Sequence, residues 1–245
     1  RGDRKRDYPQ SIFYQSAWYR EYPLIENHFA RVNLALTQGR PVCRIGVIHP
    51  LESLWLHCGP TEQNQKDIDR IEKNWENVTE WLLFGGYDFD FISESMLKPL
   101  YSGEGAPLQV GKEHYDVVVV PECETLRRST MECLRKFHNA GGTIVFAGEI
   151  PAMVDAIPSA APADLANTCV RIPLEKSAMR SALCPFRDIR IQNMDGSCTE
   201  EYLYQMREDA YGRWLFLACG KAQEDEETPK DICLTIPGSW KAELY

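Results

Sequence analysis

Short apolar runs alternate with longer amphipathic segments between residues 43 and 173. The four consecutive valines at 117–120 show no polar alternation, which is typical of a strand covered on both faces. The pattern therefore predicts an α/β fold with a doubly wound, mostly parallel sheet. We expect the strands at 43–50, 88–94, 116–121, 143–148 and 168–173.

Three segments have apolar residues at the period of an α-helix. Residues 22–38 have a proline in the first turn, and residues 61–86 end in two glycines. Residues 129–142 begin with Ser129, a residue suited to an N-cap, and also end in two glycines. The first of these helices precedes the predicted sheet, and the other two connect its strands.

The two ends of the chain differ from its middle. Residues 8–22 hold six aromatic side chains without regular spacing. After residue 185, short segments of strand character are separated by turn residues, which predicts an antiparallel β-rich segment, the start of a β-sandwich. We therefore expect three domains, at 1–41, 42–184 and 185–245.

The composition excludes several classes of ligand. The net charge is −9, whereas binding to nucleic acid needs clustered lysines and arginines. No apolar run approaches the ~20 residues of a membrane-spanning helix, so we expect no membrane partner. The nine cysteines are scattered and include no C-x-x-C pair, which argues against a metal site and favours a reducing, cytoplasmic compartment.

Ligands of open parallel sheets bind beyond the carboxyl ends of the strands. The turns there contain neither a glycine-rich phosphate-binding motif nor the G-x-S-x-G motif of serine hydrolases, so we expect no cofactor. Cys123 follows the third strand and is a candidate nucleophile. Glu122 and Glu124 flank it and raise the cost of a thiolate, which Arg127 and Arg128 could offset. We expect an unreactive thiol.

Several stretches of the chain resemble, in the same order, those of a known family. They read "RKRDYPQSIFYQSAWYREY", "QGRPVCRIGVIHPLESLW", "GGYDFDFISE", "YDVVVVPECETL" and "WLFLACG". Residues 42–155 are similar to the class I glutamine amidotransferase-like domain that accompanies large bacterial glycoside hydrolases. Examples are the trimerisation domain of family 42 β-galactosidases and related domains of family 106 rhamnosidase-like proteins. The resemblance implies a flavodoxin-like topology for the predicted sheet.

The resemblance also bears on catalysis. In active amidotransferases the nucleophilic cysteine follows the strand that corresponds to residues 143–148. This chain has Gly148-Glu149-Ile150-Pro151 there, and no histidine lies beyond residue 138 to complete a catalytic pair. Cys123 stands in a different turn. We therefore expect no catalytic residue and no amidotransferase activity.

In the large glycoside hydrolases that carry this domain, an upstream (β/α)8 barrel catalyses the reaction on the sugar. Residues 1–41 resemble the last loop and helix of such a barrel. The resemblance implies that this chain is an inactive, non-catalytic accessory piece of a longer glycoside hydrolase, used in interdomain packing or oligomer assembly. Its expected partners are the upstream barrel, a second copy of the chain and carbohydrate. Two alternatives are a small cysteine-dependent enzyme that uses Cys123 and a carbohydrate-binding module.

Six residues are candidates for sugar binding or for interdomain packing, because aromatic rings and nearby acids serve both purposes. They are Tyr8, Tyr14, Trp18, His49, Glu52 and Trp55. Carboxylates also follow the predicted strands, and a glycosidase needs two of them ~5 to 9 Å apart. We interpret these acids as solvated strand-end residues, and they are Glu52, Glu94, Glu122, Glu124 and Glu149.

Overall fold

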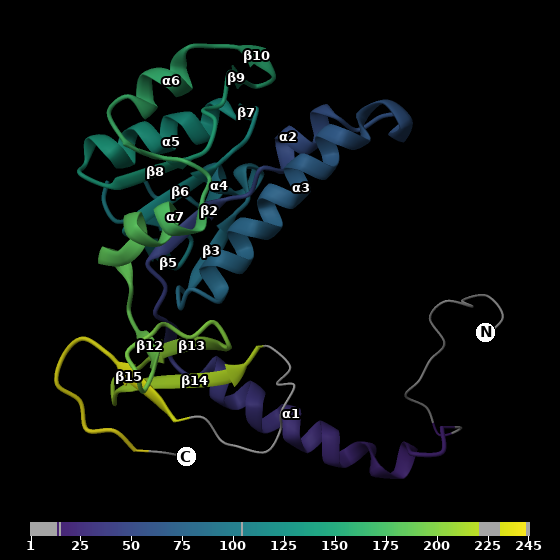
Figure 1. The fold of residues 1–245 in the computed structure, drawn as a ribbon, viewed down its shortest axis with the longest axis vertical. Helices are drawn as coiled ribbons and strands as arrows, with labels where there is room; N and C mark the ends of the chain where they lie inside the picture. Colours follow the sequence, from purple (N-terminus) through teal and green to yellow (C-terminus); the bar gives the residue numbers. More distant parts are fainter. Residues whose placement is uncertain (1–13, 15, 104, 221–230, 244–245) are drawn as a thin grey trace. The chain divides into compact units, whose positions relative to one another are not determined.

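The computed structural model describes residue 14 and residues 16–103, 105–220 and 231–243. The chain divides into two compact units, whose elements are labelled in Figure 1. The sheet unit comprises Val42–Tyr204 and Leu217–Tyr245. The helix unit comprises Arg1–Pro41 and Gln205–Phe216.

Five parallel strands form the centre of the sheet unit, in the order β11-β8-β6-β2-β3. They are β2 (Ile45–Ile48), β3 (Phe89–Ile92), β6 (Val117–Pro121), β8 (Thr143–Ala147) and β11 (Val170–Ile172). Numbered along the chain, these strands have the order 2-1-3-4-5 of a flavodoxin-like sheet. The predicted fold class and all five predicted strands are confirmed.

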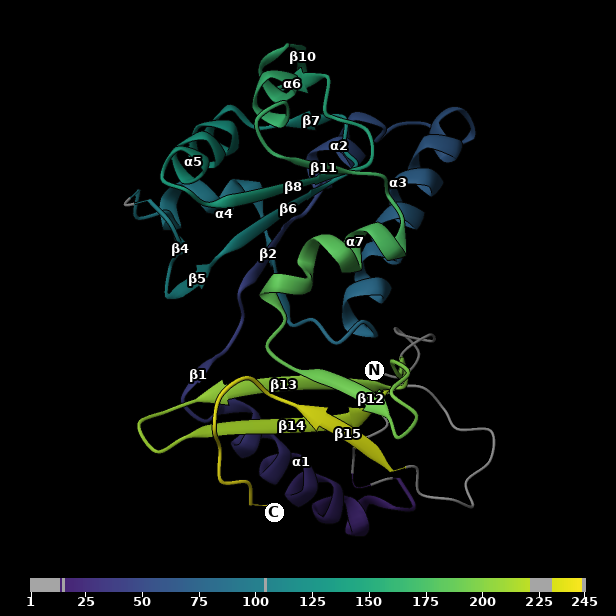
Figure 2. The same ribbon diagram turned by 60° about the vertical axis from the view of Figure 1, so that its left-hand side comes forward.

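Helices cover both faces of this sheet, as Figure 2 shows. Because successive strand residues point to opposite faces, Val118 and Val120 of β6 belong to one apolar core, and Val117 and Val119 belong to the other. The helices of the first core are α4 (Glu94–Leu100), α5 (Arg128–Asn139) and α6 (Ala161–Ala166). Those of the second core are α3 (Thr61–Leu83) and α7 (Lys176–Leu183). The four valines are therefore buried on both sides, as their pattern predicts.

Two expected turns contain helices instead. The stretch after β2 forms α2 (Leu51–Leu56), and the stretch after β3 forms α4. The prediction of Ser129 as an N-cap is wrong, because α5 begins at Arg128 and no side chain of its own first turn caps it. The first N–H groups are bound by carboxylates from elsewhere in the chain: Glu94 accepts from the Arg127 N–H at 2.7 Å, and Asp155 accepts from the Arg128 N–H at 2.9 Å.

Smaller elements surround the central sheet. A hairpin pairs β4 (Leu108–Val110) with β5 (Glu113–Tyr115), and β12 (Arg190–Asn193) pairs antiparallel with β15 (Ile232–Thr235). A third small sheet has the order β10-β9-β7. Its strands are β7 (Thr125–Leu126), β9 (Met153–Val154) and β10 (Ile157–Pro158), and a 3-10 turn, η3 (Cys184–Phe186), follows α7.

The helix unit contains η2 (Tyr19–Glu21), α1 (Tyr22–Thr37) and β1 (Arg40–Pro41). Strand β1 pairs antiparallel with β13 (Tyr202–Glu208), which lies next to β14 (Arg213–Cys219), so the predicted antiparallel β-rich segment is confirmed. Gly39 has φ +54°, and a Cβ there would lie 2.0 Å from the Glu208 carbonyl oxygen, so this turn requires glycine. Among the described residues, no helix combines the length and apolar character that crossing a bilayer requires.

Candidate functional site

The strand order places the topological switch point of the sheet between β2 and β6. The chain runs from β2 to its neighbour β3 on one side, and β6 lies on the other side. Open α/β sheets bind ligands at such a point, beyond the carboxyl ends of the strands. The segments that meet there are α2 after β2 and the turn Glu122–Thr125 after β6.

Ser53 holds these two segments together. Its side chain is fully buried, and its Oγ accepts hydrogen bonds from the backbone N–H groups of Glu124 at 2.9 Å and Thr125 at 3.2 Å. The turn after β6 is thereby fixed to α2 by a buried hydroxyl with good geometry. The side chains that leave these two segments consequently have defined positions.

The carboxylates of this turn belong to a closed ionic network. Arg70 of α3 donates from one Nη atom to Glu122 Oε1 and from the other to Glu124 Oε1, each at 2.8 Å. His57 Nε2 lies 2.9 Å from Glu124 Oε1, and Asn74 donates to Glu122 Oε1 at 3.0 Å. These acids are therefore partnered rather than solvated. No group of three His, Cys, Asp or Glu residues in the described part of the chain could hold a metal ion.

Cys123 lies between the two networked glutamates and is buried, with 5% of its surface exposed. Burial raises the pKa of its thiol well above the ordinary value, and the negative charges of Glu94 and Glu122 raise this pKa further. The turn after β8 contains no cysteine, serine or threonine. Gly148 has φ +93° there, and a Cβ at this position would lie 2.9 Å from Glu122 Oε2.

A second pair of acids lies beside the network. Glu94 at the start of α4 is 1% exposed; its Oε2 accepts the Arg127 N–H, and its Oε1 has no hydrogen-bond partner among the described residues. Burial raises the pKa of Glu94 to about 7, and the neighbouring Glu52 adds to this effect. Glu52 itself accepts a hydrogen bond from Arg127 Nε at 2.7 Å.

A cavity of about 530 Å³ opens at the switch point. It lies where the segments after β2 and β6 meet the turn between β9 and β10. Its lining residues are Glu52, Trp55, Leu56, Lys98, Thr125, Leu126, Arg127, Arg128, Ser129, Glu132, Asp155 and Ala156.

The structure brings two of the six candidate residues into this cavity, Glu52 and Trp55. His49 instead stacks on Trp75, with ring centroids 4.5 Å apart, and burial lowers the pKa of its imidazole. Tyr14 and Trp18 belong to the helix unit, where both are exposed. Tyr8 lies outside the described residues.

Arg127, Arg128 and Asp155 also line the cavity but were not expected as site residues. Arg128 donates from Nε to Asp155 Oδ2 at 3.3 Å. The "RR" pair after β6 was a visible signal for the two arginines. No sequence signal points to Asp155, because it reaches the site only through the small sheet that pairs β7 with β9.

No family model and no curated protein matches the chain. Among solved structures, the chain is similar to the crystal structure of the cold-adapted β-galactosidase from Rahnella sp. R3, with 14% sequence identity and a TM-score of 0.34. The alignment covers 81% of this chain and 26% of that protein. The chain therefore spans about a quarter of the length of that β-galactosidase.

Proposed function

We propose that this chain is a non-catalytic accessory region of a glycoside hydrolase-like protein and that it serves in interdomain packing or oligomer assembly. The relation to glycoside hydrolases rests on the sequence blocks described above. The assembly role rests on one observation in the structure, the partly exposed apolar stripe of α1.

The strand ends of the sheet unit support the non-catalytic part of the proposal. Cys123 is buried between acids that raise its pKa, and the turn after β8 contains no cysteine, serine or threonine. The nearby Glu122 and Glu124 are already paired with Arg70. An acid–base pair for glycoside chemistry would need one protonated carboxyl and one free carboxylate in reach of the substrate. Glu94 is the acid with the raised pKa, and it is buried.

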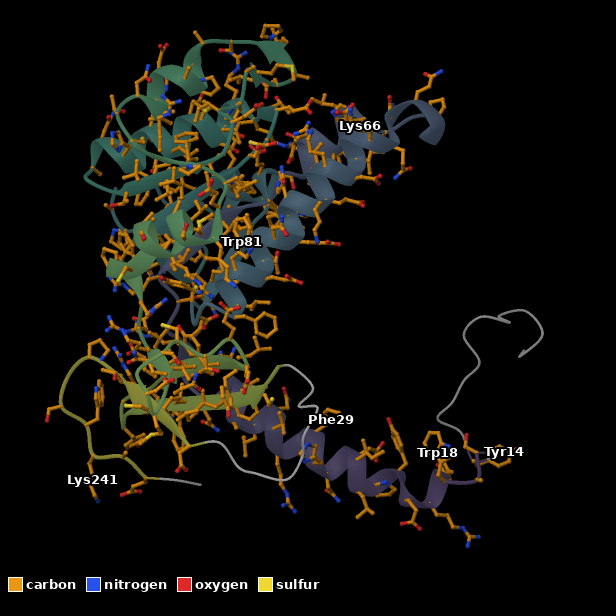
Figure 3. All side chains as sticks on the ribbon, in the orientation of Figure 1. Tyr14, Trp18, Phe29, Lys66, Trp81 and Lys241 are labelled. Atoms are coloured by element: carbon orange, nitrogen blue, oxygen red, sulfur yellow. The ribbon has the colours of Figure 1, made fainter. Side chains whose placement is uncertain are left out.

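The apolar stripe of α1 supports the assembly part. Ile25, Phe29, Val32 and Leu36 are spaced at intervals of four, three and four residues, so they share one face of the helix. Val32 and Leu36 are half-buried at the C-terminal end, whereas Ile25 is 46% exposed and Phe29 is 62% exposed. The stripe is thus longer than the surface that covers it. Figure 3 labels Phe29 on this helix and Trp18 just before it.

Covering the exposed half of the stripe would stabilise a complex. Full burial of one such side chain contributes about 1.5–3 kcal/mol, so the exposed fractions of Ile25 and Phe29 correspond to roughly 2 kcal/mol or more together. Trp18, which is 44% exposed, would add to this amount. An isolated chain has its own copies as available partners, and we expect it to self-associate through this stripe.

Sedimentation velocity over a range of protein concentrations tests the proposal. The wild-type chain should form concentration-dependent oligomers, and Phe29→Glu should reduce them because a carboxylate cannot be buried there without a partner. Leu34→Glu is the matched control: Leu34 is also 62% exposed on α1 but lies off the stripe. A wild-type chain that stays monomeric at every concentration would refute the assembly role. Equal effects of the two substitutions would refute the role of the stripe.

A further inference from the structure

The cavity at the switch point is a place where this fold binds small molecules. It lies between α2, which follows β2, and the residues after β6, which is the crevice where open α/β sheets hold their ligands. Its volume of about 530 Å³ falls within the ~300–1,000 Å³ typical of ligand pockets. The ionic network of Glu122 and Glu124 does not line it. The cavity is therefore separate from the closed part of the strand-end surface.

Trp55 gives the cavity an aromatic wall. The residue is 50% exposed although it lies on a helix that Ser53 fixes to the turn after β6. Half of this large apolar ring is therefore open to solvent at the cavity wall. A flat ring on a fixed helix suits a ligand that has an apolar face, and the C–H face of a sugar ring is such a surface.

The charges of the lining decide between a neutral and an anionic ligand. Three cationic residues face three acidic ones, and the six are Lys98, Arg127, Arg128, Glu52, Glu132 and Asp155. At neutral pH the lining therefore has no net charge. Arg127 is paired with Glu52 at 2.7 Å, and Arg128 is paired with Asp155 at 3.3 Å. A phosphate or carboxylate ligand that approached these arginines would also meet their carboxylate partners.

Hydroxyl groups match this lining better than anions do. The two ion pairs use the Nε atoms of Arg127 and Arg128, and the Nη groups of both have no hydrogen-bond partner among the described residues. A hydroxyl can accept from a guanidinium and donate to the adjacent carboxylate at the same time. A ligand with several hydroxyls on one ring could use both pairs.

The turn that places Asp155 is held in an unfavourable conformation. Asp155 and Ala156 have φ values of 53° and 62°, and neither residue is glycine. Two contacts hold them there: the Asp155 carboxylate accepts the Arg128 N–H, and the Ala156 N–H donates to Thr125 Oγ1 at 3.0 Å. The acid at the edge of the cavity is thus positioned before any ligand arrives.

We propose that this cavity is a binding site for a neutral sugar, with Trp55 stacking on the ring and the Arg127–Glu52 and Arg128–Asp155 pairs binding its hydroxyls. The inference goes beyond the assembly role, because it concerns the sheet unit and uses no residue of α1. It would stand if the chain proved monomeric, and the assembly role would stand if no sugar bound.

Ligand-observed NMR and tryptophan fluorescence titrations of the full chain test the site. The probes are D-glucose, D-galactose, L-rhamnose, cellobiose and lactose, with inorganic phosphate and citrate as the anionic arm. At least one sugar should bind the wild-type chain, and Trp55→Ala should weaken that binding by about tenfold or more. Trp55→Phe, which keeps an aromatic face, should retain part of it.

Trp240→Ala is the matched control, because Trp240 is also 50% exposed but does not line the cavity. It should bind the sugar as the wild-type chain does. Asp155→Asn keeps an oxygen for the Arg128 N–H but loses the charge, and it should weaken sugar binding while the chain stays folded by circular dichroism. The proposal is overturned if no sugar of the panel binds, if Trp55→Ala binds as well as the wild type, or if the anions bind in place of the sugars.

Discussion

Glu94 should make the stability of the sheet unit depend on pH. Its carboxyl is 1% exposed, and burial raises its pKa from 4.5 to about 7. A carboxyl whose pKa is higher in the folded state binds its proton more tightly there than in the unfolded chain. Its favourable contribution is therefore complete below the unfolded pKa and is lost as the pH rises through about 7. Above that pH the folded protein holds a buried carboxylate.

The size of the effect follows from the shift. A change from 4.5 to about 7 spans roughly two and a half pH units, and each unit corresponds to about 1.4 kcal/mol, so the loss approaches about 3 kcal/mol. Most of it falls between pH 5 and 8, where we expect about 2–3 kcal/mol. Glu94→Gln cannot ionise, yet it keeps an oxygen that can accept the Arg127 N–H. The variant should be more stable than the wild-type chain at pH 8 and should lose this part of the pH dependence.

Urea unfolding followed by circular dichroism at a series of pH values measures the effect. The free energies of unfolding of the wild type and of Glu94→Gln should diverge as the pH rises from 5 to 8. Glu132→Gln provides the control, because Glu132 is an exposed acid of α5. Its curve should run parallel to that of the wild type. Parallel curves for Glu94→Gln and the wild type would show that Glu94 is not held as a buried neutral acid.

Two further experiments test the hypothesis that the chain is non-catalytic. Iodoacetamide at neutral pH, with peptide mass spectrometry, should label exposed Cys58, Cys184 and Cys198 well before buried Cys123; preferential labelling of Cys123 with an apparent pKa well below ~8.5 would contradict it. The chain should also release no aryl group from aryl rhamnosides or galactosides, because Glu94 is buried, Glu52, Glu122 and Glu124 are paired with arginines, and the exposed Glu149 has no second acid presented with it. Turnover that disappears in Glu52→Gln or Glu149→Gln would overturn that expectation.

The fold could be predicted because its signals are local. The run of valines in β6 predicts a strand that is covered on both faces. The helical period of residues 61–86 predicts which face of α3 packs on the sheet. The short helix α2 escaped prediction because the proline and histidine before it resemble a turn, and six residues are too few to show a period. The assignments of residues 1–41 to a barrel and of residues 185–245 to a β-sandwich stay predictions.

The site could be predicted only in part, because its contacts join distant segments. Glu52 and Trp55 were found since both follow a strand end, where ligands of such sheets bind. The bond from Asp155 to the N-terminus of α5 depends on the pairing of β7 with β9, which no local pattern encodes. For the same reason the acids after β6 were interpreted as solvated. Arg70, which partners them, lies more than fifty residues earlier in the chain.

Two places at the strand ends of the sheet unit differ in the room that they offer: the turn after β8 and the cavity between β2 and β6. Next to β8, Glu122 lies so close to Gly148 that a side chain with a Cβ cannot be added without displacing it, and Arg70 and Asn74 hold that glutamate in place. A cysteine or serine at position 148 would therefore be strained, because φ is +93° there and Glu122 would have to shift. Between β2 and β6 the cavity stays open, and its lining holds the Arg127–Glu52 and Arg128–Asp155 ion pairs. The cavity is therefore where we propose that a ligand binds, and the turn after β8 is where we expect no thiol chemistry.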